Sequence, residues 1–171
     1  MTSRSDRPFD IIVFGATSFV GKILCRYLVE RHGTDSDLAW AIAGRNEAKL
    51  ASVAEATGAD VVRIVADAGD AEAMAELAES TRLVISTVGP YALYGSKLVA
   101  AVAAAGTDSV DLTGEPQWMQ RMIDTHSTTA EASGARIVHT CGFDSIPSDL
   151  GVWFTQGQAS ARFDEPCTAI A

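Results

Sequence analysis

Short apolar runs alternate along the chain with segments in which apolar residues recur at helical spacing. Residues 11–14 (Ile-Ile-Val-Phe) are apolar throughout, which is typical of a buried strand. Similar runs predict five further strands, at residues 38–43, 61–65, 83–86, 110–112 and 136–139.

The segments between these runs have the spacing of amphipathic helices. In the first of them, ended by Gly33, apolar residues recur at i, i+3, i+4, i+7 and i+8. This spacing predicts a buried helix face made of Val20, Ile23, Leu24, Tyr27 and Leu28. Four further helices have predicted inner faces at Leu50, Val53 and Ala54, at Met74, Leu77 and Ala78, within residues 96–105, and at Met119, Met122, Ile123 and His126 or its neighbours. Asn46, Asp70 and Pro116 are expected to begin three of them, and Pro147 a last helical stretch.

Six strands that alternate with helices predict an α/β fold with a parallel sheet covered by helices on both faces. This is the doubly wound plan, in its dinucleotide-binding (Rossmann) form. The 171 residues suffice for one such domain, which we expect at residues 1–151. Residues 152–171 end on an apolar stretch and are predicted to begin a connection to a substrate domain that is absent from this chain.

Composition narrows the classes of function. Hydrophobic residues make up 47% and charged residues 20% of the chain, a globular composition. The net charge of −9 argues against a nucleic-acid-binding domain and against electrostatic docking on anionic lipid. Three separated cysteines favour a reduced, cytoplasmic compartment, and the three histidines lack metal-ligand spacing, so no metal site is expected. No run reaches the ~18 apolar residues of a membrane-spanning helix.

The strongest local motif is a glycine-rich turn between the first strand and the first helix. Gly15 allows a tight turn, Gly21 allows close packing of helix on strand, and the free N–H groups of the helix N-terminus favour a pyrophosphate. Ser18 stands where a G-x-x-G-x-x-G motif has its middle glycine. Its hydroxyl has two open roles, as a cap of the helix or as a donor to a phosphate oxygen.

The end of the second strand indicates which dinucleotide is bound. NAD-binding domains usually carry an acidic residue there, whereas this chain has Arg45, which can pair with a 2′-phosphate. Lys49 lies one helical turn further on. The interpretation is NADP(H) rather than NAD(H). Asp67, at the end of the third strand, either meets the adenine edge or caps the turn before Asp70.

Three later strand ends are also rich in glycine and polar residues, and ligands of such sheets bind beyond the carboxyl ends of the strands. They contain STVGPYALYG, DLTGE and CGFDSIPSDLG. Together with GATSFVG and AGRN, these motifs resemble the saccharopine dehydrogenase-like oxidoreductases, and within them the mycobacterial type of trans-acting enoyl reductase. The resemblance covers residues 10–151.

The resemblance implies that the chain binds NADPH. It assigns to the pyrophosphate Gly15, Thr17, Ser18, Phe19, Val20 and Gly21, to the 2′-phosphate Arg45, and to the nicotinamide ribose Thr87, Val88 and Gly89. It further implies reduction of a carbon–carbon double bond in polyketide-derived acyl chains, in lipid and glycolipid biosynthesis, beside a partner polyketide synthase. Peripheral association with the inner face of the plasma membrane and a homo-oligomeric state stay open.

The proton donor and the reaction class leave alternatives. Tyr91 and Asp144 are candidates by position, against a packed tyrosine and a loop-capping aspartate. A short-chain dehydrogenase is excluded because no Tyr-x-x-x-Lys pair exists. A saccharopine-type amino-acid dehydrogenase and a non-enzymatic NADPH-binding sensor or scaffold remain as other hypotheses.

Overall fold

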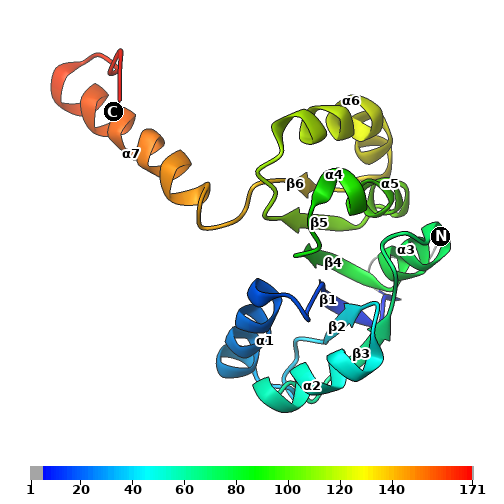
Figure 1. Ribbon diagram of the computed structural model, residues 1–171. Helices are drawn as coiled ribbons and strands as arrows, with labels where there is room; N and C mark the ends of the chain where they lie inside the picture. The colour runs from blue at the N-terminus through cyan, green and yellow to red at the C-terminus, as the bar shows by residue number, and fades with distance from the viewer. Residues whose placement is uncertain (1–5, 171) are drawn as a thin grey trace.

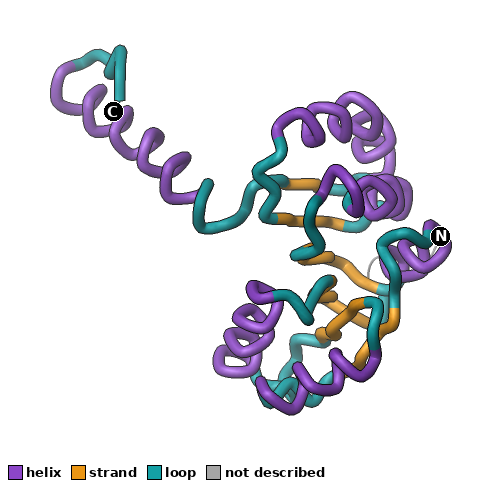
Figure 2. Tube along the Cα trace, viewed as in Figure 1, coloured by secondary structure: helices purple, strands orange, loops and turns teal. Residues whose placement is uncertain are grey.

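The computed structural model describes residues 6–170 and has one parallel sheet between two layers of helices (Figures 1 and 2). The strands are β1 Phe9–Phe14, β2 Trp40–Gly44, β3 Val62–Val65, β4 Thr81–Ser86, β5 Asp108–Asp111 and β6 Ile137–Val138. The helices are α1 Phe19–His32, α2 Glu47–Thr57, α3 Ala71–Glu79, α4 Tyr91–Tyr94, α5 Ser96–Ala105, α6 Pro116–Ser133 and α7 Ile146–Phe163.

The strand order is β3-β2-β1-β4-β5-β6, with every neighbouring pair parallel. This order confirms the predicted doubly wound dinucleotide-binding plan of six strands. The order reverses direction between β1 and β4, so the loops that follow these two strands diverge and leave a crevice at the carboxyl edge of the sheet. The predicted strand ranges agree with the observed ones to within about two residues, the usual uncertainty of strand ends.

Two hydrophobic cores lie on opposite faces of the sheet, because successive strand residues point to opposite sides. On β1, Ile12 and Phe14 pack with the inner residues of α3 and α5. Val13, between them, packs against α1 and α2. Figure 1 shows the same division, with α1 and α2 on one side of the sheet and α3 and α5 on the other.

The predicted inner face of α1 is wrong in part. Val20, Ile23 and Tyr27 are 40%, 54% and 56% exposed, whereas α1 buries Gly21, Cys25 and Leu28. The helix turns its small residues toward the sheet because a Cβ at Gly21 would lie 2.4 Å from the Gly15 carbonyl oxygen. The close contact of Gly21 with the Gly15 carbonyl therefore sets the rotation of α1, although the other face of the helix carries the larger apolar side chains.

The other helices follow the sequence more closely. Asn46 and Asp70 cap α2 and α3 through their side chains, and α6 begins at Pro116, as predicted. On α6 the buried residues are Trp118 and Met122, while the predicted Ile123 is exposed. The four-residue helix α4 was not predicted, because one helical turn is too short to show a periodicity.

Helix α7 stands clear of the sheet (Figure 1). Most of its large apolar side chains are exposed, among them Leu150, Trp153 and Phe154. It runs from Ile146 to Phe163, so the predicted domain boundary after residue 151 falls inside it. The position of that boundary stays a prediction.

A matched pair of substitutions tests the rotation of α1. Leu28→Ala should lower the free energy of unfolding by about 2–5 kcal/mol, because it leaves a cavity against the sheet. Ile23→Ala should change it by less than about 0.5 kcal/mol, because the side chain is more than half exposed. Urea unfolding measures both, and a larger loss for Ile23→Ala would contradict the observed face.

Candidate functional site

The turn between β1 and α1 demands glycine at two positions. Gly15 has a φ of +91°, and a Cβ there would lie 2.7 Å from Thr87 Oγ1 and 2.8 Å from Val88 Cγ2. Gly21 packs directly on the carbonyl of Gly15, as described for α1. Both reasons that the sequence suggests for glycine, a tight turn and close packing of the helix, are therefore present in the fold.

Ser18 joins this turn to the end of β4. Its Oγ accepts the N–H of Gly21 at 2.9 Å and lies 2.9 Å from Thr87 Oγ1, which in turn donates to the carbonyl of Gly15 at 2.9 Å. Each hydroxyl has a single proton. Because the single hydroxyl proton of Thr87 is used in its hydrogen bond to the Gly15 carbonyl, Ser18 is the donor in the hydrogen bond between the two hydroxyls. Of the two roles open for Ser18, the structure shows the helix cap.

A cleft of about 300 Å³ opens over the carboxyl ends of β1 to β4. It brings together eight of the residues predicted to bind the cofactor: Gly15, Thr17, Ser18, Arg45, Asp67, Thr87, Val88 and Gly89. The volume lies at the lower end of the range of small-molecule sites. Residues from four strand ends thus meet at the place where the topology predicts a ligand.

The cleft lining omits three predicted residues and contains others that the sequence did not indicate. Phe19 and Val20 are exposed, Gly21 is buried behind the turn, and none of the three lines the cleft. The additional lining residues are Phe14, Gly44, Ala66, Ala68 and Tyr94. The small residues carry no chemical signal in the sequence, and Tyr94 belongs to the unpredicted α4.

Asp67 has the turn-forming role of the two that the sequence left open, and its contact with adenine stays a prediction. Its Oδ1 accepts the N–H of Gly69 at 2.7 Å, which forms the turn before α3, and the residue also lines the cleft. Arg45 lines the cleft as well and is exposed, so its guanidinium is accessible to a ligand. Lys49 is not among the lining residues.

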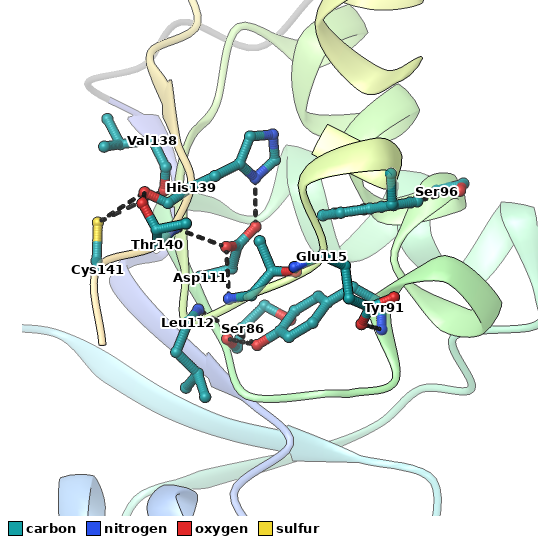
Figure 3. A network of polar contacts seen from close by, with 12 residues as sticks. Ser86, Tyr91, Ser96, Asp111, Leu112, Glu115, Val138, His139, Thr140 and Cys141 are labelled. Atoms are coloured by element: carbon teal, nitrogen blue, oxygen red, sulfur yellow. Dashed lines mark hydrogen bonds and ion pairs between the residues drawn. The ribbon is translucent and has the colours of Figure 1, made fainter. Parts of the chain in front are cut away.

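A buried polar network connects β4, β5 and β6 beside the cleft (Figure 3). Asp111 Oδ2 lies 2.6 Å from His139 Nδ1, and each of these side chains is 7% exposed. The other oxygen of Asp111 accepts backbone N–H groups from Thr113 and Thr140 at 3.1 and 3.3 Å. Asp111 thus has three polar contacts, one with Thr113 and two with the neighbouring residues His139 and Thr140.

The DLTGE motif also orients α4. Glu115 accepts the backbone N–H groups of Tyr91 and Ala92 at 2.6 and 2.9 Å, which satisfies free donors at the start of that helix. The motif therefore has a structural task at the strand end, in addition to any contact with a ligand.

The two candidate proton donors are not placed for that role. Tyr91 is buried, its hydroxyl donates to the carbonyl of Ser86 at 3.0 Å and accepts the N–H of Leu112 at 3.3 Å. Burial, more than the nearby Asp111 and Glu115 carboxylates, raises the pKa of Tyr91 to about 12. Asp144 is exposed and does not line the cleft. Tyr91 is thus a packed tyrosine with a bonded hydroxyl.

The sequence of this chain matches one protein family over most of its length. Residues 11–138 match the saccharopine dehydrogenase NADP binding domain. The chain belongs to the saccharopine dehydrogenase NADP-binding family. Every residue that lines the cleft lies within this matched range.

Relatives of this saccharopine dehydrogenase-type domain include proteins named trans-acting enoyl reductase. The protein of this name from Mycobacterium ulcerans is 43% identical over 153 residues, which cover 88% of this chain and 36% of the relative. A lipid droplet localized protein of Caenorhabditis elegans is 41% identical over 153 residues, 85% of this chain and 36% of the relative. The chain thus spans about a third of the length of these relatives.

Apo saccharopine dehydrogenase (L-Glu forming) from Saccharomyces cerevisiae has a similar fold. The TM-score is 0.68 at 17% sequence identity, and the match covers 90% of this chain and 32% of the yeast protein. At this identity the likeness supports the fold alone.

A double-mutant cycle tests the link between the turn and β4. Ser18→Ala should lower the free energy of unfolding by about 1 kcal/mol through loss of the helix cap. Because Ser18 and Thr87 share a hydrogen bond, the loss in Ser18→Ala/Thr87→Val should differ from the sum of the single losses by about 0.5 kcal/mol or more. Urea unfolding of the four proteins measures this, and additive losses would contradict the link.

The raised pKa of Tyr91 predicts a loss of stability in alkali. A pKa raised from 10.0 to about 12 in the folded state means that the stabilisation is complete below pH 10 and is lost as the pH rises toward 12. The free energy of unfolding of the unsubstituted chain should therefore fall more steeply across this range than that of Tyr91→Phe. Urea unfolding at a series of pH values compares the two, and parallel curves would contradict the assignment.

Proposed function

We propose that this chain is the cofactor-binding part of an NADPH-dependent enoyl reductase that acts on polyketide-derived acyl chains in lipid and glycolipid biosynthesis. The observation that carries the proposal is the cleft, which gathers a glycine-rich turn and an exposed arginine in a domain of an NADP-binding family. The names of the mycobacterial relatives support the enoyl reductase reaction.

The cleft fits a dinucleotide phosphate. A side chain at Gly15 would collide with Thr87 and Val88, and one at Gly21 with the Gly15 carbonyl, so the two glycines let β1, β4 and α1 pack closely around the turn. The N-terminus of α1, with its free N–H groups, would then receive a pyrophosphate. In our proposal the pyrophosphate lies over the turn at Gly15, Thr17 and Ser18, where Thr17 and the N-terminus of α1 offer donors, and Arg45 pairs with the 2′-phosphate. Thr87, Val88 and Gly89 then face the nicotinamide ribose.

In this proposal the chain acts by binding and orientation. NADPH supplies a hydride when bound, and the walls of the cleft hold the dinucleotide in one pose. The proton that must reach the neighbouring carbon comes from elsewhere, because the hydroxyl of Tyr91 is bonded within the protein and Asp144 lies outside the cleft. We assign the proton donor to a substrate domain.

Two observations support a further domain. The chain spans about a third of the length of its relatives, and α7 exposes Leu150, Trp153 and Phe154 to solvent. We propose that residues 152–171 lead toward that domain, and that it recognises the acyl chain and a partner polyketide synthase. Alone, the present chain is expected to bind NADPH with little or no turnover.

The proposal includes attachment to lipid. No helix among residues 6–170 has the length and apolar character needed to cross a bilayer. One relative is named for its localisation to lipid droplets. We propose a cytoplasmic enzyme with peripheral attachment to a lipid surface.

Oxidation of NADPH tests the proposed reaction. The chain, alone and joined to the remainder of its gene product, is mixed with an enoyl thioester or with saccharopine-type substrates, and the absorbance of NADPH is followed. Consumption with the enoyl thioester, only in the longer protein, is expected. Turnover of an amino-acid substrate, or binding without any turnover in the longer protein, would refute the enoyl reductase proposal.

Substitution of Arg45 tests the choice of cofactor. Arg45→Ala should weaken NADPH binding about tenfold or more, because it removes a charged partner of the 2′-phosphate. The affinity for NADH, which lacks this phosphate, should change little. Arg121→Ala, an exposed arginine on α6 outside the cleft, is the matched control. Equal losses for NADPH and NADH, measured by calorimetry, would contradict the role of Arg45.

A further inference from the structure

Tyr94 is an aromatic lining residue of the cleft that the cofactor assignment above leaves without a task. It ends α4 and is 41% exposed. Among the described residues its hydroxyl has no hydrogen-bond partner, and its ring makes none of the aromatic contacts that join Tyr91, Trp118 and His139. The ring is therefore partly accessible from the cleft.

The position of Tyr94 along the cleft follows from its neighbours. Lys97, one turn further on, donates from Nζ to the carbonyl of Gly69, in the loop between β3 and α3. Ala66 in turn donates its N–H to the carbonyl of Gly44 at the end of β2. The start of α5 thus lies against the loop that follows β3, and Tyr94 belongs to the β2–β3 half of the cleft.

The walls of this half suit a flat base with an amino group at its edge. Ala66 and Ala68 offer small apolar surfaces. Asp67 has Oδ1 engaged by Gly69, whereas no described residue bonds to Oδ2. An ionised carboxylate only accepts hydrogen bonds, so its free oxygen fits a donor such as the exocyclic amino group of adenine.

We propose that the ring of Tyr94 stacks on the adenine of the bound dinucleotide, while Asp67 Oδ2 accepts its amino group. Aromatic side chains stack on bases through their π-faces. Lys97 acts as a positioning residue, because its bond to Gly69 holds the Asp67 loop against the start of α5, which directly follows the helix that carries Tyr94. This inference rests on the proposed binding of NADPH and assigns the residues of its adenine subsite.

Binding of adenosine 2′,5′-bisphosphate, the adenine half of NADPH, tests the inference on the 171-residue chain. Tyr94→Leu should weaken this probe about tenfold, and NADPH by a similar factor, whereas Tyr94→Phe keeps the aromatic ring and should leave both affinities unchanged. Tyr27→Leu, an exposed tyrosine on α1 outside the cleft, is the control and should change neither. Calorimetry measures the dissociation constants.

Proton NMR of the adenine H2 and H8 signals distinguishes stacking from a structural effect. Both signals should move upfield on binding to the unsubstituted chain and to Tyr94→Phe, and this ring-current shift should disappear in Tyr94→Leu. If Tyr94→Leu does not fold, nuclear Overhauser contacts of H2 and H8 with the Tyr94 ring protons of the unsubstituted chain decide the matter, because Phe14 also lines the cleft.

An absent upfield shift, or an unchanged affinity of Tyr94→Leu for the adenine half, would overturn the inference. A loss of NADPH affinity without a loss for adenosine 2′,5′-bisphosphate would place the ring at the nicotinamide half and overturn it as well. If the unsubstituted chain binds neither compound, the proposed cofactor function itself fails. A failure confined to the Tyr94 variants leaves that function intact.

Discussion

The hydroxyl of Thr87 holds the carboxyl ends of β1 and β4 together, and the geometry of the cleft depends on it. It donates a hydrogen bond to the carbonyl of Gly15 and accepts one from the hydroxyl of Ser18. The oxygen of Ser18 in turn caps the first turn of α1. The approach is so close that no side chain fits at Gly15. Because the turn is fastened on both sides, the N-terminus of α1 is directed across the topological switch point of the sheet.

The two halves of the carboxyl edge serve different purposes. Over β1 to β4 the strand ends leave a cleft with accessible polar groups, among them Arg45. Over β5 and β6 the polar groups are buried or half-buried and bonded within the protein, as Asp111 is to His139 and Glu115 is to the start of α4. A buried charge or hydroxyl needs a partner, so this network ties three chain segments together rather than presenting free groups to a ligand. The motifs at the ends of β1 to β4 therefore line the cleft, whereas the DLTGE motif after β5 supports the neighbouring chain segments.

The sequence was informative where one local feature decided the outcome and misleading where packing did. Asn46 and Asp70 cap their helices because a cap involves only a few consecutive residues. The inner face of α1 was predicted from the size of its apolar side chains, yet close contact of Gly21 with the turn rotates the helix onto a smaller face. Trp118 was missed for a related reason. Its burial depends on the rings of Tyr91 and His139, which belong to distant parts of the chain.

By itself the sequence determined the alternation of strands and helices, the parallel sheet, the glycine turn and the arginine that follows β2, because these depend on periodicity and on residue type at strand ends. Only the tertiary structure decided the task of Ser18, the packed state of Tyr91 and the presence of Tyr94 in the cleft. Each of these depends on which groups from other strand ends lie within a few ångströms. That proximity results from the order of the strands and the rotation of the helices, and no local pattern of residues encodes it.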